Sequence, residues 1–133
     1  MTDFLDFQTL QRPASPNTAL IAPMGATPQA SPDAPAPEFA CAPQETFARL
    51  VQLAEARRDW TELAADPAGL RLRFVAVTRL LRFKDDVDIV VLPVAGKPDQ
   101  STLAAYSRSR LGYSDLGTNL KRLKALCADL ALP

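Results

Sequence analysis

One polar block, residues 106–122, carries residue types that could do chemistry. Arginine and serine alternate in it, then a glycine turn leads into a segment that is typical of a helix. Strand-end arginines beside the free first-turn amides of a helix form a generic site for an anion. With two neighbouring acids, the predicted motif and ligand-binding residues are Asp85, Asp86, Ser107, Arg108, Ser109, Arg110, Tyr113, Ser114, Asp115, Asn119 and Arg122.

The same residues also have a structural interpretation, which we prefer. Ser114 or Asp115 would cap the helix, and Asn119 would bond a carbonyl of the turn. Asp85 or Asp86 would pair with an arginine across the sheet. Because neighbours on a strand point to opposite faces, these two acids are not expected to act as a catalytic pair.

The composition argues against several function classes. The chain has no histidine, which removes the usual general base and imidazole metal ligands. Its two cysteines, Cys41 and Cys127, form no CxxC pair, so we expect no metal site and no cofactor. Residues 44–133 carry 14 basic and 11 acidic groups, which is too weak a bias for a nucleic-acid binder. We therefore do not expect an enzyme or a nucleic-acid-binding protein.

A long motif resembles a known family. Phe83-Lys84-Asp85-Asp86 is followed, some twenty residues on, by the polar block that ends at Arg122. Residues 40–130 as a whole resemble the family called domain of unknown function 1499. The resemblance implies an α+β fold and no particular activity. Many members carry a membrane or lipoprotein anchor and a cysteine after a Pro-Asn step, where this chain has Thr18, a departure that suits a cytoplasmic branch.

The periodicity of apolar residues predicts a two-layer α+β sandwich with the order α-β-β-β-β-α. We expect helices at residues 43–58 and 115–132, and antiparallel strands at 60–64, 70–82, 86–92 and 101–110. The residues expected to face inward from the strands are Leu72, Phe74, Ala76, Leu80, Val87, Ile89 and Val91. The apolar face of the second helix is expected to be Leu116, Leu120, Leu123, Leu126, Cys127 and Leu130.

Residues 1–42 are predicted to form an extended, proline-rich arm ahead of an α+β domain at 43–133, because proline bars helix and central strand. Its large apolar side chains are expected to dock on a partner: Phe4, Leu5, Phe7, Leu10, Leu20, Ile21 and Phe39. For residues 1–12, folding back on the domain is the alternative. No stretch resembles a signal peptide or a membrane span, so we expect a cytoplasmic location.

These observations favour a non-catalytic interaction protein. We expect an accessory or assembly subunit that docks on a larger, membrane-associated complex through its arm and domain surface, at the cytoplasmic side. Its partner would be a protein. The alternative is a protein that binds a small anion or an anionic lipid headgroup with Arg108, Arg110, Arg122 and the helix N-terminus.

Overall fold

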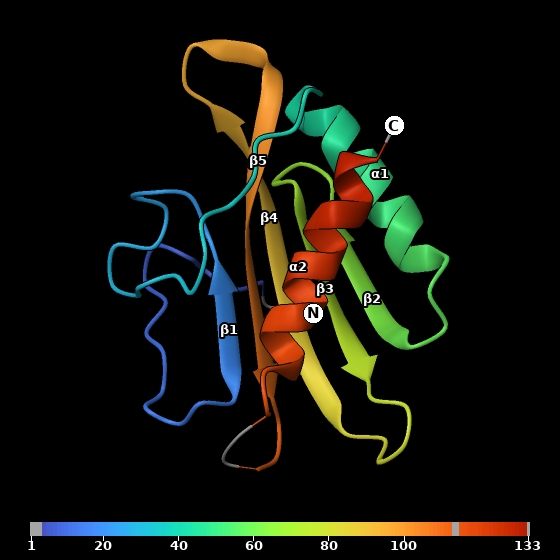
Figure 1. The fold of residues 1–133 in the computed structure, drawn as a ribbon. Helices are drawn as coiled ribbons and strands as arrows, with labels where there is room; N and C mark the ends of the chain where they lie inside the picture. Colours follow the sequence, from blue (N-terminus) through green and yellow to red (C-terminus); the bar gives the residue numbers. More distant parts are fainter. Residues whose placement is uncertain (1–3, 113–114, 133) are drawn as a thin grey trace.

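The computed structural model describes residues 4–112 and 115–132. Its elements are β1 (Thr18–Ile21), α1 (Pro43–Glu55), β2 (Trp60–Asp66), β3 (Arg71–Val77), β4 (Lys84–Val94), β5 (Lys97–Ser109) and α2 (Thr118–Ala131). The strands form one antiparallel sheet in the order β1-β5-β4-β3-β2, and both helices cover one face of it (Figure 1). The α+β class is confirmed, with one strand more than expected.

Two element boundaries differ from the prediction in a way that matters below. β3 ends at Val77, not at residue 82, so Leu80 is 94% exposed instead of facing inward. α2 begins at Thr118, not at residue 115, so Leu116 is 88% exposed instead of packing on the helix face. In the described part of the chain, neither helix is long and apolar enough to cross a membrane.

The main core lies between the sheet and the two helices. Phe74, Ile89 and Leu103 point to it from the sheet, as strand alternation requires, and Leu50 and Leu126 meet them from α1 and α2. Cys127 is a free thiol in the same core. Its burial raises the pKa of the thiol to about 11.

The additional strand comes from the segment that the sequence analysis separates as an arm. β1 pairs with β5 at the edge of the sheet, in a register that places Leu20 opposite Tyr106. Ile21 points to the helix side, whereas Leu20 points to the other face, where Phe7 and Leu10 cover it. Side chains from residues 5–30 therefore form, with Ala104 and Tyr106 of β5, a second, smaller core on the face that the helices leave open.

The prolines of this segment explain its path. Pro16 and Pro23 flank a proline-free run of six residues, which is long enough for the four-residue edge strand β1. Arg12 and Asp33 form an ion pair of 2.9 Å, and an Asp33 carboxylate oxygen accepts the Leu20 amide at 2.9 Å. These contacts hold the irregular parts of the segment against β1.

The docking role expected for the arm conflicts with this burial. Five of its seven docking candidates are at most 7% exposed: Phe7, Leu10, Leu20, Ile21 and Phe39. Phe39 is also tied to Ser101 by two backbone hydrogen bonds of 2.7 and 3.1 Å. For the N-terminal residues, the structure favours the alternative of folding back on the domain, because the open face of the sheet supplies the apolar surface that they need.

Candidate functional site

The polar block does not form one site, because its residues divide between the two faces of the sheet. Ser107 and Ser109 point toward α2, whereas Arg108 and Arg110 point to the opposite face. The antiparallel register pairs Asp85 with Ser109 and Asp86 with Arg108, so the two acids divide in the same way. The three arginines of the expected anion site, with Arg122 on the helix side, are therefore not brought together.

On the helix side, a buried ion pair joins α2 to the sheet. Arg122 Nη2 lies 2.8 Å from Asp85 Oδ2, and the two side chains are 12% and 2% exposed. Arg122 Nη1 also donates to Asn119 Oδ1 at 2.9 Å and to Ser107 Oγ at 3.2 Å. Removing two charges from water is costly, and these additional hydrogen bonds offset part of that cost.

Asn119 is the centre of this network, which we call the buried polar network (Asp85, Ser107, Ser109, Asn119 and Arg122). Its side-chain Nδ2 donates to Ser109 Oγ at 2.8 Å and to the Asn17 backbone carbonyl at 3.1 Å, and its Oδ1 accepts from Ser107 Oγ. It thus joins α2, β5 and the chain leading into β1. Since its hydrogen-bonding groups are already engaged inside the protein, the structural interpretation accounts for these residues.

Asp115 occupies the amides that the expected anion would need. Its Oδ1 accepts the Gly117 amide at 2.8 Å, and its Oδ2 accepts the Asn119 amide at 3.2 Å. This is the capping role foreseen as one alternative for Asp115, performed from just outside the helix, whose N-cap is Gly117. Tyr113 and Ser114, also predicted site residues, lie outside the described residues.

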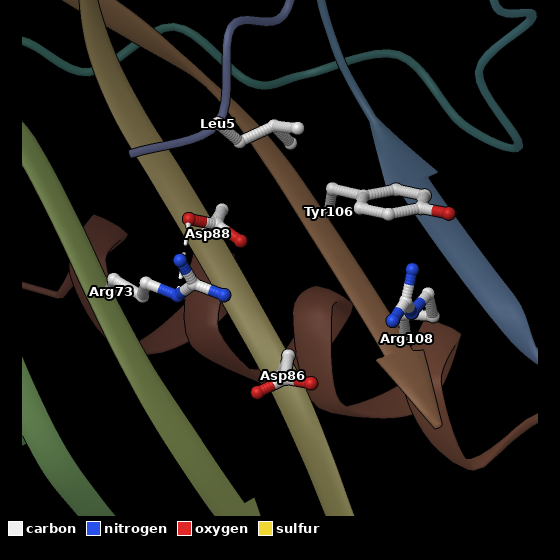
Figure 2. Close-up of a pocket in the computed structure, with 6 residues that line it drawn as sticks. All are labelled: Leu5, Arg73, Asp86, Asp88, Tyr106 and Arg108. Carbon is white, nitrogen blue, oxygen red and sulfur yellow. Dashed lines mark ion pairs between the residues drawn. The ribbon is translucent and has the colours of Figure 1, made fainter. Parts of the chain in front are cut away.

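On the opposite face, a cleft of about 190 Å³ opens between the sheet and the N-terminal segment. Figure 2 shows Asp86 and Asp88 on β4, Arg73 on β3, and Tyr106 and Arg108 on β5 around it. Leu5, also shown there, closes one side of the cleft. Two cationic and two anionic side chains line this cleft, so its charge is close to balanced.

The two acids of the cleft have opposite pKa shifts. Asp86 forms a double hydrogen bond with Arg110, at 2.9 and 3.0 Å, which lowers the pKa of the Asp86 carboxyl. Asp88 is 8% exposed, and no described residue forms a hydrogen bond with its Oδ1. Among the described cations, Arg73 forms an ion pair with it, at 3.9 Å from Nε to Oδ1. Burial therefore raises the pKa of Asp88, and Arg73 offsets only part of the rise.

A further feature is a cavity of about 470 Å³ between the β3–β4 loop and the described parts of the β5–α2 loop. In the described residues, eight large apolar side chains are exposed, and five of them line this cavity. These are Leu80, Leu81, Phe83, Leu111 and Leu116, with exposed fractions of 94%, 70%, 47%, 75% and 88%. We call residues 79–84 with Leu111 and Leu116 the loop-end surface.

The backbone of the loops enforces this exposure. Thr78 and Phe83 close the first loop, because the Thr78 amide donates to the Phe83 carbonyl at 2.9 Å and the Phe83 amide donates to Thr78 Oγ1 at 2.8 Å. The turn places Arg82 at φ 57°, and Leu116 in the other loop has φ 55°. Such angles are uncommon for residues other than glycine, so the backbone at Arg82 and at Leu116 has a specific conformation.

Sequence reasoning missed the loop-end surface, although a signal was present. Leu80 and Leu116 were assigned to a strand and to a helix, where apolar side chains are expected to be buried. The run Arg79-Leu80-Leu81-Arg82-Phe83-Lys84 breaks the two-residue alternation that β3 follows as far as Val77. That break indicates a turn that presents its apolar residues to solvent.

Comparisons with known proteins place the chain in a family. Among solved structures it is similar to the di-domain ARO/CYC protein BexL from the BE-7585A biosynthetic pathway, at 14% identity and a TM-score of 0.44. The match covers 71% of this chain and 40% of BexL, and a likeness this distant says nothing about function. A search of the curated proteins finds no match. The family model "Protein of unknown function (DUF1499)" matches residues 9–130, and the chain therefore belongs to the DUF1499 family.

Proposed function

We propose that this protein is a non-catalytic interaction protein, an accessory or assembly subunit that docks on a larger, membrane-associated complex through its loop-end surface. The observation that carries the proposal is the gathering of five exposed apolar side chains around one cavity. Contiguous exposed apolar surface in a folded protein marks an interaction site or a binding groove. We place the protein at the cytoplasmic side of that complex.

The energetics support docking at this end. Burying one leucine or phenylalanine side chain contributes about 1.5–3 kcal/mol. Because Leu80, Leu81 and Leu116 are at least 70% exposed, nearly all of this contribution is still available to a partner. The arm was expected to have this role, but its buried apolar side chains already contribute their burial to the protein's own two cores.

The charges specify the chemistry of the partner surface. Arg79, Arg82 and Lys84 are exposed between the apolar residues, and residues 79–84 contain no acid. A complementary surface therefore presents apolar groups beside anionic groups.

Substitution of the loop leucines tests the proposal. Full-length tagged Leu80→Ser/Leu81→Ser protein should lose the proteins that the parent captures from native extract in mild detergent. Met24→Ser is the matched control, because Met24 is 101% exposed and does not line the cavity. Capture of the same proteins by parent, loop variant and control would contradict the proposal.

A small-anion function is the second candidate, and Arg108 is the observation that favours it. Its exposed guanidinium lines the cleft of Figure 2, and no described residue forms an ion pair with it. Inorganic phosphate should raise the melting temperature of the parent, and Arg108→Gln should remove that effect. Equal stabilisation of both proteins would exclude Arg108 as the anion ligand.

A further inference from the structure

The loop-end surface has the composition of a segment that lies in a membrane interface. Building on the proposed function, which makes this surface the docking site, we infer that it docks directly on an anionic phospholipid bilayer. Leu80, Leu81, Phe83, Leu111 and Leu116 enter the boundary between headgroups and acyl chains. Arg79, Arg82 and Lys84 contact the lipid phosphates. Interfacial segments combine leucine and phenylalanine with lysine and arginine in this manner.

The topology brings the two loops to one end of the molecule. In the sheet, Val77 pairs with Lys84 and Asp85 pairs with Ser109, so the end of β3, the start of β4 and the end of β5 are adjacent. Figure 1 shows the β3–β4 loop and the described parts of the β5–α2 loop at the lower end of the sheet, away from the β4–β5 hairpin. The apolar side chains can therefore enter one surface together.

The degree of exposure suits insertion into the lipid that surrounds a membrane-associated complex. At 94% and 88% exposed, Leu80 and Leu116 protrude from the loops instead of forming a flat patch. A protein partner would need a matching pocket for each protruding side chain, because stable protein interfaces are closely packed. Lipid adapts to their shape, and the cavity between the loops leaves both of its apolar walls open to lipid.

The nearby acids do not cancel the loop cations. Asp85 is buried against Arg122, Asp86 is paired with Arg110, and Asp115 accepts two backbone amides. The positive charge of residues 79–84 is therefore available to attract the phosphates of a membrane surface. Each basic residue near an anionic membrane surface strengthens binding by about fivefold, and salt weakens this attraction.

Vesicle flotation of the full-length protein tests the inference. The protein should float with phosphatidylcholine vesicles that contain phosphatidylglycerol, should not float with pure phosphatidylcholine vesicles, and should be released by high salt. Leu80→Ser/Leu81→Ser should weaken binding by at least about tenfold, since each leucine loses its apolar burial. Arg79→Gln/Arg82→Gln should weaken it by about 25-fold.

Controls separate the surface from net charge and from misfolding. Lys97→Gln/Lys124→Gln removes the same charge from exposed positions outside the loop-end surface and should bind within about twofold of the parent. Melting curves should be unchanged in every variant, because all the substituted side chains are exposed.

Several results would overturn the inference. The first three are failure of the protein to bind anionic vesicles, equal binding to neutral vesicles, and parent-like binding by both loop variants. The fourth is a protein that binds no vesicles but forms a dimer, which the Leu80→Ser/Leu81→Ser substitution dissociates. If vesicles are not bound but the leucine variant still loses its protein partners, the bilayer inference fails and the proposed function stands. If both assays are unaffected by the loop variants, both fail.

Discussion

The buried polar network and the loop-end surface come from neighbouring stretches of the same chain, but each has the opposite burial to the one that its residue types predict. The residue types of Asp85, Asn119 and Arg122 are typical of a functional site. Their side chains are nevertheless nearly buried, and Arg122 bonds to each of the other two. Leu80 and Leu116 look like core, yet they are almost fully exposed. In this part of the fold, polar side chains join α2 to the sheet, and apolar side chains of the loops are exposed to solvent.

The position of α2 on the sheet explains why these polar residues are buried and the loop leucines are exposed. A helix that crosses a sheet near the strand ends leaves unpaired backbone groups at its first turn, and these need polar partners. Asp115, which lies beside the buried polar network, supplies a partner by accepting the Gly117 and Asn119 amides. The loops beyond the sheet edge have no layer to cover them, so their leucines stay in solvent.

Breaking the network should have the largest effect. Asp85→Ala leaves the guanidinium of Arg122 buried without its counter-ion, so the free energy of unfolding should fall by about 3–5 kcal/mol. Asp86→Ala is the matched control one residue away. It breaks an ion pair whose arginine is 42% exposed, and it should cost less than about 1 kcal/mol in urea denaturation. An equal loss of unfolding free energy in the two variants would refute the assignment of Asp85 to the buried face and Asp86 to the exposed face.

A pair of leucines tests the two apolar regions. Leu20→Ala removes a fully buried side chain from the second core and should lower the free energy of unfolding by about 2–5 kcal/mol. Leu80→Ala should change it by less than about 0.5 kcal/mol, because the side chain has almost no packing to lose. A small effect of Leu20→Ala would mean that the N-terminal segment does not belong to the stable fold.

The smallest effect concerns the pH dependence of the two acids in the cleft. The pKa of Asp86 is lowered, so its contribution to stability is present above the usual value of 3.8 and is lost as the pH falls. The pKa of Asp88 is raised, so its contribution is present below 3.8 and is lost as the pH rises through the raised pKa.

At pH 7, Asp86→Asn should therefore lower the free energy of unfolding by less than about 1 kcal/mol, and Asp88→Asn should raise it. Both differences from the parent should shrink toward pH 3, where the carboxyls are protonated. Denaturation at a series of pH values measures them. Differences of the same sign would show that burial does not dominate at Asp88.

Local pattern predicts much of the main sheet and both helices. Val87, Ile89 and Val91 alternate inward as expected, and all three are buried. Asp85 and Asp86 point to opposite faces, which period-two geometry requires. β1 was missed, because a four-residue strand gains its stability from β5, some ninety residues away, and nothing in its own residues records that partner.

For the candidate site, the sequence by itself determined the alternation of Arg108 and Arg110 against Ser107 and Ser109, and the mixture of cations and leucines in residues 79–84. Both are properties of neighbouring residues. The tertiary structure alone decided that Arg122 meets Asp85, that the N-terminal segment is buried, and that Leu80 and Leu116 share one exposed cavity. Those outcomes depend on where the sheet ends and which face α2 covers, and long-range packing sets both.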